Sequence, residues 1–445
     1  MDLTLSLSML AIVFATIGLV WHRQPQQVKL TGLIVSACIF LSLLNPADRN
    51  WSSQSGILSL FVSASAFLSI LSQQPRQQAA HSIASIVMLC SFSLAYLDER
   101  TVQPMRAISL ALLLITLIFL AVSRGKTKSI ANCTAVFFSI AFLCFAASFL
   151  ASGIVKSILI LVVAAVFLPL LPFHAGFVGS LSCLPGTVRA FGAFVLPCLG
   201  WQIIATNLMP FPDPIVSTVI ALSICGGLLS TIRAIAQIDI DQTFASVGTI
   251  LFSLAWLNFV AKSGSAEATG WYVVSVALAL NGLLLCTYHL RDKYGDNLRD
   301  NLPGLDQTMP RLSLVFRLLI MACAGFPPFA LFVMTMSMML TSNQVYIPIW
   351  IVLISMICSL LLVSVMQQLL FGKRRADLIY EDIRKGDVVA LAILILLLFT
   401  SGAIPYTFDS VRKPEGAYRG SAIPPLPTKS MQVPVSLTGG DSTLC

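Results

Sequence analysis

Long apolar runs separated by short polar loops are the feature that most restricts the fold of this chain. We place the runs near residues 3–21, 30–45, 55–73, 81–98, 105–123, 130–151, 154–172, 187–206, 214–236, 243–261, 270–290, 312–341, 346–371 and 387–406. Most of them are long enough to cross a hydrocarbon layer of roughly 30 Å. They lack the short alternating pattern of a transmembrane β-barrel. The sequence therefore predicts an all-α polytopic membrane protein with about 14 transmembrane helices.

Composition supports this prediction. Only 10% of the 445 residues are charged, and 57% are hydrophobic, whereas about a quarter of the residues in soluble domains are charged. Such a chain cannot cover a surface that faces water, so its main solvent must be lipid. We expect three regions: N-terminal transmembrane helices over 1–123, a transmembrane core over 124–406, and a disordered tail rich in Pro, Gly and Ser over 407–445.

Loop charges predict how the chain is oriented. The segments 22–29, 73–78, 124–128 and 372–387 are basic, and the loops between the first three carry balanced charges. Because basic loops stay on the cytoplasmic side, both termini are expected outside, in a bacterial inner (plasma) membrane. These loops also explain the net charge of +8, so we expect a lipid bilayer and no nucleic acid as partner. The 11 cysteines lack zinc-ligand or redox spacing, and we expect no metal and no cofactor.

Two stretches interrupt the helical pattern. The first, near 167–190, contains the prolines and glycines that we expect to break a helix, followed by a new helix from about residue 187: Pro169, Pro172, Gly176, Pro185 and Gly186. The second, near 321–332, contains Pro327 and Pro328. Proline removes an amide donor and clashes with the preceding turn, and transporters use such breaks near ion paths. From the prolines alone, a re-entrant loop or tight hairpin without a transport role is an equal alternative.

Four segments resemble motifs of one family. They are "FLPLLPFHAGFVG…PGTVRAFGAFVL", "AIAQIDIDQTFASVGTILFS", "LIMACAGFPPFALFV", and "MQQLLFG" followed by "VVALAILILLLFTSGAIP". In order and spacing, over about 150–404, they resemble the proton-pumping membrane subunits of NADH-quinone oxidoreductase, particularly chains M and N, and the large subunits of Mrp-type antiporters. This resemblance implies an antiporter-like fold of fourteen helices, with two inverted five-helix repeats that each contain one broken helix. It also implies proton movement along buried lysines, a glutamate and histidines.

The chain departs from the family pattern at key positions. Arg189 stands where the family has a broken-helix lysine, and Asp241 stands where it has a second lysine. The spans at 81–98, 105–123 and 130–151 contain no glutamate, and the span at 270–290 has Asn281 in place of a lysine or histidine. Arginine does not release its proton in proteins, so Arg189 cannot act as a proton-transfer site. It can still form an ion pair or bind an anion.

The remaining ion-pathway candidates are His174, Arg189, Arg233, Asp239 and Asp241. His174 is the best candidate for a switch, with a histidine held by neighbouring carbonyls as the alternative. Asp239 and Asp241 are expected at a helix end, where they are either part of a site or solvated loop acids. A local ion pair between Arg233 and Asp239 is plausible, and Arg189 is either paired or reaches a water layer.

Three functions fit these observations. The first is a divergent proton-translocating or energy-coupling membrane subunit that works with other membrane subunits of an NADH-quinone oxidoreductase- or Mrp-like complex. The second is a non-pumping membrane anchor that docks a soluble catalytic subunit, which the missing lysines and glutamate favour. The third is a subunit similar to the DabB type, which takes part in inorganic-carbon uptake. No catalytic residue set is present in the sequence, so the chain is at most a non-catalytic subunit of an oxidoreductase-like complex.

Overall fold

The computed structural model describes residues 25–44, 54–75, 79–98, 103–124, 128–207, 212–260, 266–295, 304–341, 346–371 and 382–412. The chain divides into two compact units, Met1–Pro405 and Tyr406–Cys445. The described part of the second unit is limited to residues 406–412, where the last helix ends. The tail was predicted over 407–445, but residues 407–412 form the end of the last helix, so the predicted start of the tail is wrong. Residues 413–445 and the predicted first span over 3–21 lie outside the described residues.

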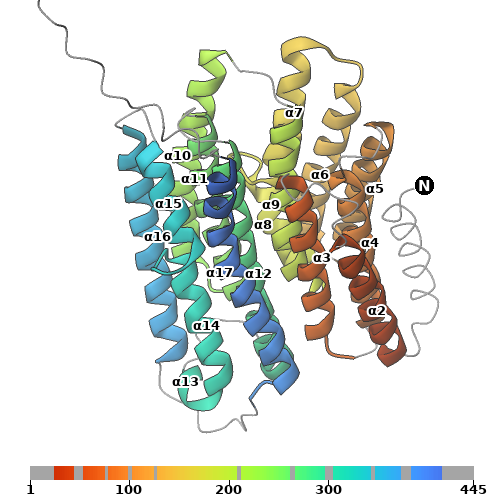
Figure 1. The fold of residues 1–445 in the computed structure, drawn as a ribbon, viewed down its shortest axis with the longest axis vertical. Helices are drawn as coiled ribbons and strands as arrows, with labels where there is room; N and C mark the ends of the chain where they lie inside the picture. The colour runs from red at the N-terminus through yellow and green to blue at the C-terminus, as the bar shows by residue number, and fades with distance from the viewer. Residues whose placement is uncertain are drawn as a thin grey trace, which may run out of the picture. The chain divides into compact units, whose positions relative to one another are not determined.

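Helices make up nearly all of the described chain (Figure 1). They are α2 (Pro25–Leu43), α3 (Gln54–Ser72), α4 (Ala79–Leu97), α5 (Gln103–Arg124), α6 (Lys128–Ser148), α7 (Gly153–Phe167), α8 (His174–Cys183), α9 (Val188–Asn207), α10 (Asp213–Ala236), α11 (Ile240–Val260), α12 (Ala266–Tyr294), α13 (Leu305–Thr308), α14 (Pro310–Cys323), α15 (Ala330–Thr341), α16 (Tyr346–Leu370) and α17 (Lys385–Arg412). Within the described residues, 11 helices are long and apolar enough to cross a membrane. The polytopic all-α class is confirmed, while the full count of fourteen remains a prediction.

The two broken helices occupy equivalent places in the chain order. Within the run α4, α5, α6, α7–α8, α9 the fourth element is interrupted, and the same holds for the run α10, α11, α12, α14–α15, α16. Each run contains five crossings, so the second run begins in the opposite direction to the first. This order is the one expected for two inverted repeats. One proline peptide bond in each break is cis, at Leu171–Pro172 and at Pro327–Pro328.

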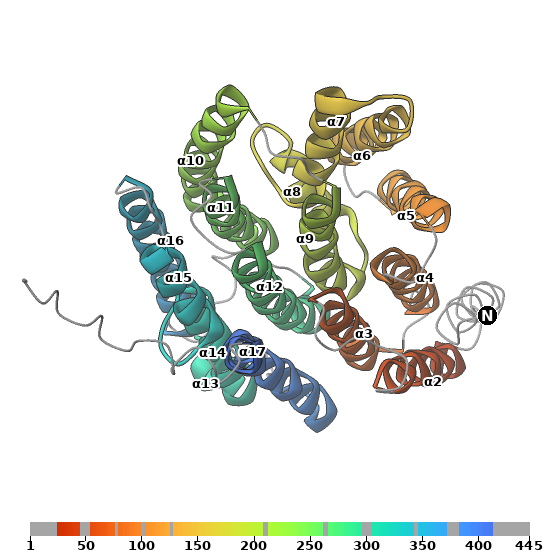
Figure 2. The same cartoon turned by 45° about the horizontal axis from the view of Figure 1, so that its top comes forward.

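The central helices are α3, α4, α9, α11 and α12. They are buried along most of their length, whereas α2, α10 and α16 are buried over only part of theirs. Figure 2 shows α12 next to α3, α9 and α11, and α12 contacts each of these three helices. Large side chains fill this centre, among them Trp201, Trp256 and Trp271. Polar groups on these helices are therefore held away from the lipid-facing surface.

The first break is shorter than the sequence predicted. It covers residues 168–173, which contain Pro169 and Pro172, and helix α8 then resumes. The expectation that Gly176 helps to break the helix is wrong, since Gly176 and Gly179 lie within α8. A Cβ atom on Gly179 would lie 2.2 Å from the Oγ1 atom of Thr134 on α6. These glycines therefore allow α8 and α6 to approach closely.

Other breaking residues lie where a turn requires them. Pro185 and Gly186 connect α8 to α9, and Gly186 has a φ of 54°, which favours glycine. Consequently α9 is a separate helix rather than the second half of the broken one. The second break is confirmed within its predicted range, because α14 ends at Cys323 and α15 begins at Ala330, with Pro327 and Pro328 between them.

Candidate ion-coupling site

An ion pair between Arg189 and Asp241 is buried among the central helices. Arg189 is the second residue of α9, and Asp241 is the second residue of α11. The Nη1 atom of Arg189 contacts the Oδ2 atom of Asp241, and the two residues are only 8% and 2% exposed. A carboxylate in the first turn of a helix is stabilised by the helix dipole. Asp241 is therefore suited to carry a negative charge here.

Asp239 holds the start of α11 in place. Its Oδ1 atom accepts a hydrogen bond of 2.9 Å from the backbone N–H of Asp241. This is the bond that an N-cap residue makes to the first turn of a helix. The sequence expectation that Asp239 and Asp241 lie at a helix end is met. However, Asp241 is buried and paired rather than solvated.

Helix α12 supplies two further contacts to Asp241. The Oγ1 atom of Thr287 donates a hydrogen bond of 2.6 Å to Oδ1. The Nη1 atom of Arg291 lies 3.8 Å from Oδ2. One carboxylate thus joins α9, α11 and α12 and faces two guanidinium groups. We call Arg189, Asp241, Thr287 and Arg291 the Asp241 cluster.

The start of α9 is also joined to α3. The backbone N–H and the hydroxyl of Thr187 donate to the Oε1 atom of Gln73, at 3.1 and 2.7 Å. The Nζ atom of Lys29 on α2 donates to the carbonyls of Leu71 and Gln73, both at 2.7 Å. Because these bonds hold the end of α3, they fix Gln73 beside the residue that precedes α9.

His174 and Arg233 form a second contact. His174 is the first residue of α8, at the edge of the first break, and its Nε2 atom contacts the Nη1 atom of Arg233 on α10. A guanidinium has donors only, so Nε2 must accept and the proton of the neutral ring must lie on Nδ1. The structure thus pairs Arg233 with His174, where the sequence led us to consider Asp239.

The sequence candidates therefore fall into two groups. Arg189, Asp239 and Asp241 come together at one end of α8, and His174 with Arg233 lies at its other end. Helix α8 has 10 residues, so the groups are separated by about 15 Å along it. Thr287 and Arg291 were missed, although their spacing of four residues on a helix was a usable signal. Within the described residues, no group of three or more His, Cys, Asp or Glu side chains is placed to hold a metal ion.

Known proteins show similarity at the level of sequence and of fold. A family model described as "NADH:quinone oxidoreductase/Mrp antiporter, TM" matches residues 81–362. The curated protein "NADH-quinone oxidoreductase subunit N 1" of Rhizobium meliloti is 26% identical over 167 residues, which cover 36% of this chain and 35% of that protein. The chain thus matches about a third of the length of this relative.

Solved membrane complexes contain chains of the same fold. A chain of respiratory complex I from Thermus thermophilus with bound NADH superposes with a TM-score of 0.79 at 14% identity, covering 91% of this chain and 96% of that one. A chain of the archaeal membrane-bound sulfane sulfur reductase gives 0.76 at 14% identity, covering 91% and 94%. A chain of the Mrp complex from Dietzia sp. DQ12-45-1b gives 0.72 at 11% identity, covering 92% and 96%. The family model spans more than half of the sequence, and the chain belongs to the NADH:quinone oxidoreductase/Mrp antiporter transmembrane family.

Proposed function

We propose that this chain is a divergent proton-translocating, energy-coupling membrane subunit of an NADH-quinone oxidoreductase- or Mrp-like complex. The observation that carries this proposal is the Asp241 cluster. Ionised side chains inside a membrane protein are expensive and are usually functional. Here a carboxylate and an arginine, only 2% and 8% exposed, are held together by three helices. A pure scaffold could fill the same space with apolar side chains at lower cost.

The chemistry of the pair assigns different roles to its members. Arg189 keeps its proton, so Asp241 is the member of the pair whose charge can change. While Asp241 is ionised, it holds α9 through Arg189 and α12 through Thr287. Protonation of Asp241 leaves Arg189 without its counter-charge. The interaction at stake is on the order of 4 kcal/mol for charges about 4 Å apart at an effective dielectric of about 20. Protonation of Asp241 would therefore weaken the attraction between α11 and α9.

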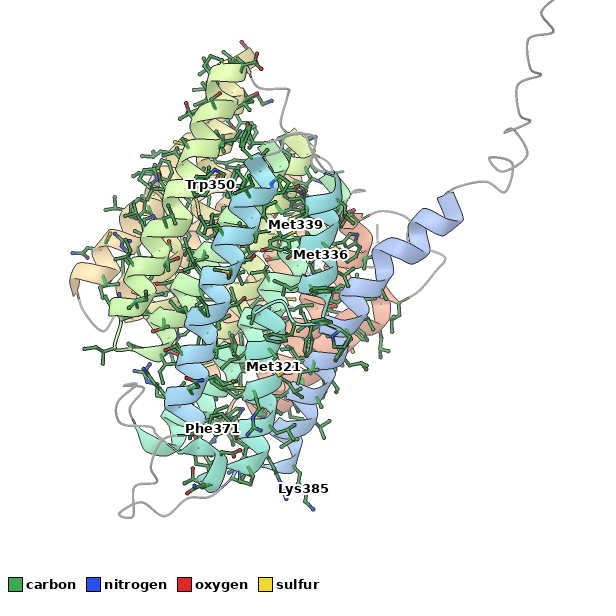
Figure 3. The ribbon with its side chains drawn as sticks, turned by 90° about the vertical axis from the view of Figure 1, so that its left-hand side faces the viewer. Met321, Met336, Met339, Trp350, Phe371 and Lys385 are labelled. Carbon is green, nitrogen blue, oxygen red and sulfur yellow. The ribbon has the colours of Figure 1, made fainter. Side chains whose placement is uncertain are left out.

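The second break supports the view that the chain works beside other membrane subunits. Helices α14 and α15 have 14 and 12 residues, or about 21 and 18 Å of helix, so the break between them lies at mid-depth. Phe326 within it is 44% exposed, and Pro327 and Pro328 are exposed as well. Figure 3 views this side of the chain, with Met321 and Met336 labelled on α14 and α15. Irregular backbone is not tolerated in contact with lipid, so we propose that a neighbouring subunit covers it.

The first break differs in this respect. The carbonyl of Leu168 accepts a hydrogen bond of 3.0 Å from the Nε1 atom of Trp256 on α11. A Cβ atom on Gly200 of α9 would lie 2.6 Å from the backbone nitrogen of Leu168. The beginning of the first break is therefore covered from within the chain, because α9 and α11 pack directly against Leu168, whereas Pro172 is exposed.

Location and orientation follow from the loops. We propose that the chain lies in a bacterial plasma membrane with its N-terminus outside. The Asp241 cluster is then near the cytoplasmic ends of the helices. Helices α9 and α11 begin there and α12 ends there, next to the basic loops on the same side. Protons would reach Asp241 from the cytoplasm.

A flux measurement tests the proposal. The tagged chain is purified in mild detergent with its partners and reconstituted into vesicles that contain a pH-sensitive dye. A potassium diffusion potential then drives protons. We expect flux above that of empty vesicles for the wild type and a return to the empty-vesicle level for Asp241→Asn with the same partners bound. Unchanged flux in Asp241→Asn would remove the coupling role.

A non-pumping anchor for a soluble partner is the second candidate. It is favoured by the described middle portions of α3, α9, α11 and α12, where the polar side chains are uncharged. In the same assay, this candidate predicts wild-type flux equal to that of empty vesicles. It also predicts that a soluble protein co-purifies with the chain and is lost when the segment 295–304, between α12 and α13, is altered.

A further inference from the structure

A row of serines connects the Asp241 cluster to the middle of the bundle. Ser65, Ser69 and Ser72 follow one another at spacings of four and three residues, so they share one face of α3. They are 0%, 0% and 1% exposed. Gln73 follows Ser72 directly in the sequence, and its side chain accepts two hydrogen bonds from Thr187. The row thus ends beside Gln73, whose partner Thr187 is two residues before Arg189 in the sequence.

The other end of the row meets Asn281. Asn281 lies near the middle of α12, and its Nδ2 atom donates to the Oγ atom of Ser65. Its carboxamide therefore faces the serine row, and the residue is fully buried at 0% exposure. Asn281 occupies the place in the chain where the family resemblance led us to look for a lysine or histidine. Buried polar side chains thus follow one another from Gln73 along α3 to Ser65, which contacts Asn281 near the centre of α12.

Several polar atoms along this row have no protein partner. They are the Oγ atoms of Ser69 and Ser72 and the Oδ1 atom of Asn281. The Nε2 atom of His289, a residue of α12 that is 1% exposed, also has none. Buried polar groups without a hydrogen bond are costly. Internal water is the ligand that satisfies such groups where several of them converge.

We propose that internal water molecules lie along Ser65, Ser69, Ser72 and Asn281 and carry protons between Asp241 and the middle of the membrane. This inference rests on the proposed function. Each water accepts a proton on one side and releases another on the other side, so a proton that enters at Asp241 leaves an excess proton on the water beside Asn281. The serines and Asn281 orient the waters through hydrogen bonds and keep their own protons. An uncharged row of this kind replaces the missing lysines as the transfer route.

The proposal requires water to reach Ser69. Ser69→Cys is compared with Ser63→Cys, a matched control on the opposite face of α3. Ser63 is also 0% exposed, and its hydroxyl donates to the carbonyl of Leu60 at 2.9 Å. The purified complex is treated with silver ions, which travel through water, and the unreacted thiol in each peptide is quantified after denaturation. We expect Ser69→Cys to react at least about tenfold faster. Equal rates, including no reaction at either position, would overturn the water row.

Proton transfer along the row needs its own test. In the flux assay, Asn281→Leu should reduce flux at least about tenfold, while Ser63→Ala should leave it unchanged. If silver reacts with Ser69→Cys but the wild-type chain gives no more flux than empty vesicles, the water row exists and the proposed function fails. Silver access with full flux in Asn281→Leu would mean that the chain translocates protons by another route, which refutes the transfer role of the row.

Discussion

Removing the charge of Asp241, alone and together with that of Arg189, measures the energy stored in the buried pair. Asp241→Asn keeps the size of the side chain but removes the partner of a guanidinium that is 8% exposed. Breaking a buried pair in this way costs about 3–5 kcal/mol, because an uncompensated charge stays behind. The hydrogen bond of 2.6 Å from Thr287 also loses its charged acceptor. Arg189→Met should lower the free energy of unfolding by a similar amount. The buried carboxylate of Asp241 then keeps Arg291 as its one remaining guanidinium partner, at 3.8 Å.

The double variant distinguishes the interaction energy of the pair from the cost of leaving one buried charge without a partner. In Arg189→Met with Asp241→Asn, both buried charges are gone, and replacing a buried pair by uncharged groups is often close to neutral. The double variant should therefore be more stable than either single variant. The coupling energy should be at least about 2 kcal/mol, within the range found for residues of one network. Arg291 remains, but its side chain is 28% exposed and can be hydrated.

Unfolding in mixed micelles titrated with a denaturing detergent provides the assay. Trp201, Trp256 and Trp271 are buried, so tryptophan fluorescence reports loss of the core. Thr218→Ala on the exposed face of α10 is the control and should change the free energy of unfolding by less than about 0.5 kcal/mol. If the double variant is destabilised by the sum of the two single effects, the residues do not interact and the coupling role of the pair is refuted.

Three further predictions concern packing, neighbours and orientation. Gly179→Leu should destabilise the chain by about 3 kcal/mol or more, because a Cβ atom there would lie 2.2 Å from a threonine hydroxyl on α6; a normal unfolding midpoint would contradict the close approach. A photo-crosslinker at Phe326 should capture a co-purifying membrane subunit, whereas one at Ile232, which is 65% exposed on α10, should capture it less; equal capture would argue against cover of the second break. In intact cells, an impermeant maleimide should label Asp213→Cys but not Lys385→Cys. The reverse pattern would contradict the proposed orientation with the N-terminus outside.

The helix breaks show what local sequence can and cannot predict. Pro169, Pro172, Pro327 and Pro328 located both breaks, because proline removes a donor wherever it stands. Gly176 was misinterpreted, because glycine serves equally to end a helix and to let two helices approach. Only the position of α6 against α8 distinguishes these uses. That contact depends on tertiary packing and leaves no mark in the sequence around Gly176.

The site follows the same division. Asp239 and Asp241 were expected at a helix end, since the apolar run of α11 begins just after them. The partner of Asp241 could not be read from the sequence, because Arg189 is 52 residues away and their contact depends on how α9 and α11 pack. His174 and Arg233 were singled out separately for the same reason. The periodicity of the serines on α3 was visible, yet only the structure shows that it faces Asn281.

Helix α8 connects the two groups of charged residues, and this bears on how an arginine can replace a lysine. A lysine can pass its proton on, whereas Arg189 can only change its partner. Its nearest alternative is the carbonyl of Leu184, which already lies 3.4 Å from Nη2 and ends α8. When Asp241 is neutral, Arg189 therefore gains from moving toward the end of α8, whose other end carries His174 at the first break. Under the proposed function, protonation of Asp241 would act on one end of α8 through Arg189, and His174 begins the other end beside the first break. Arg189 would then transmit the change while it keeps its own charge.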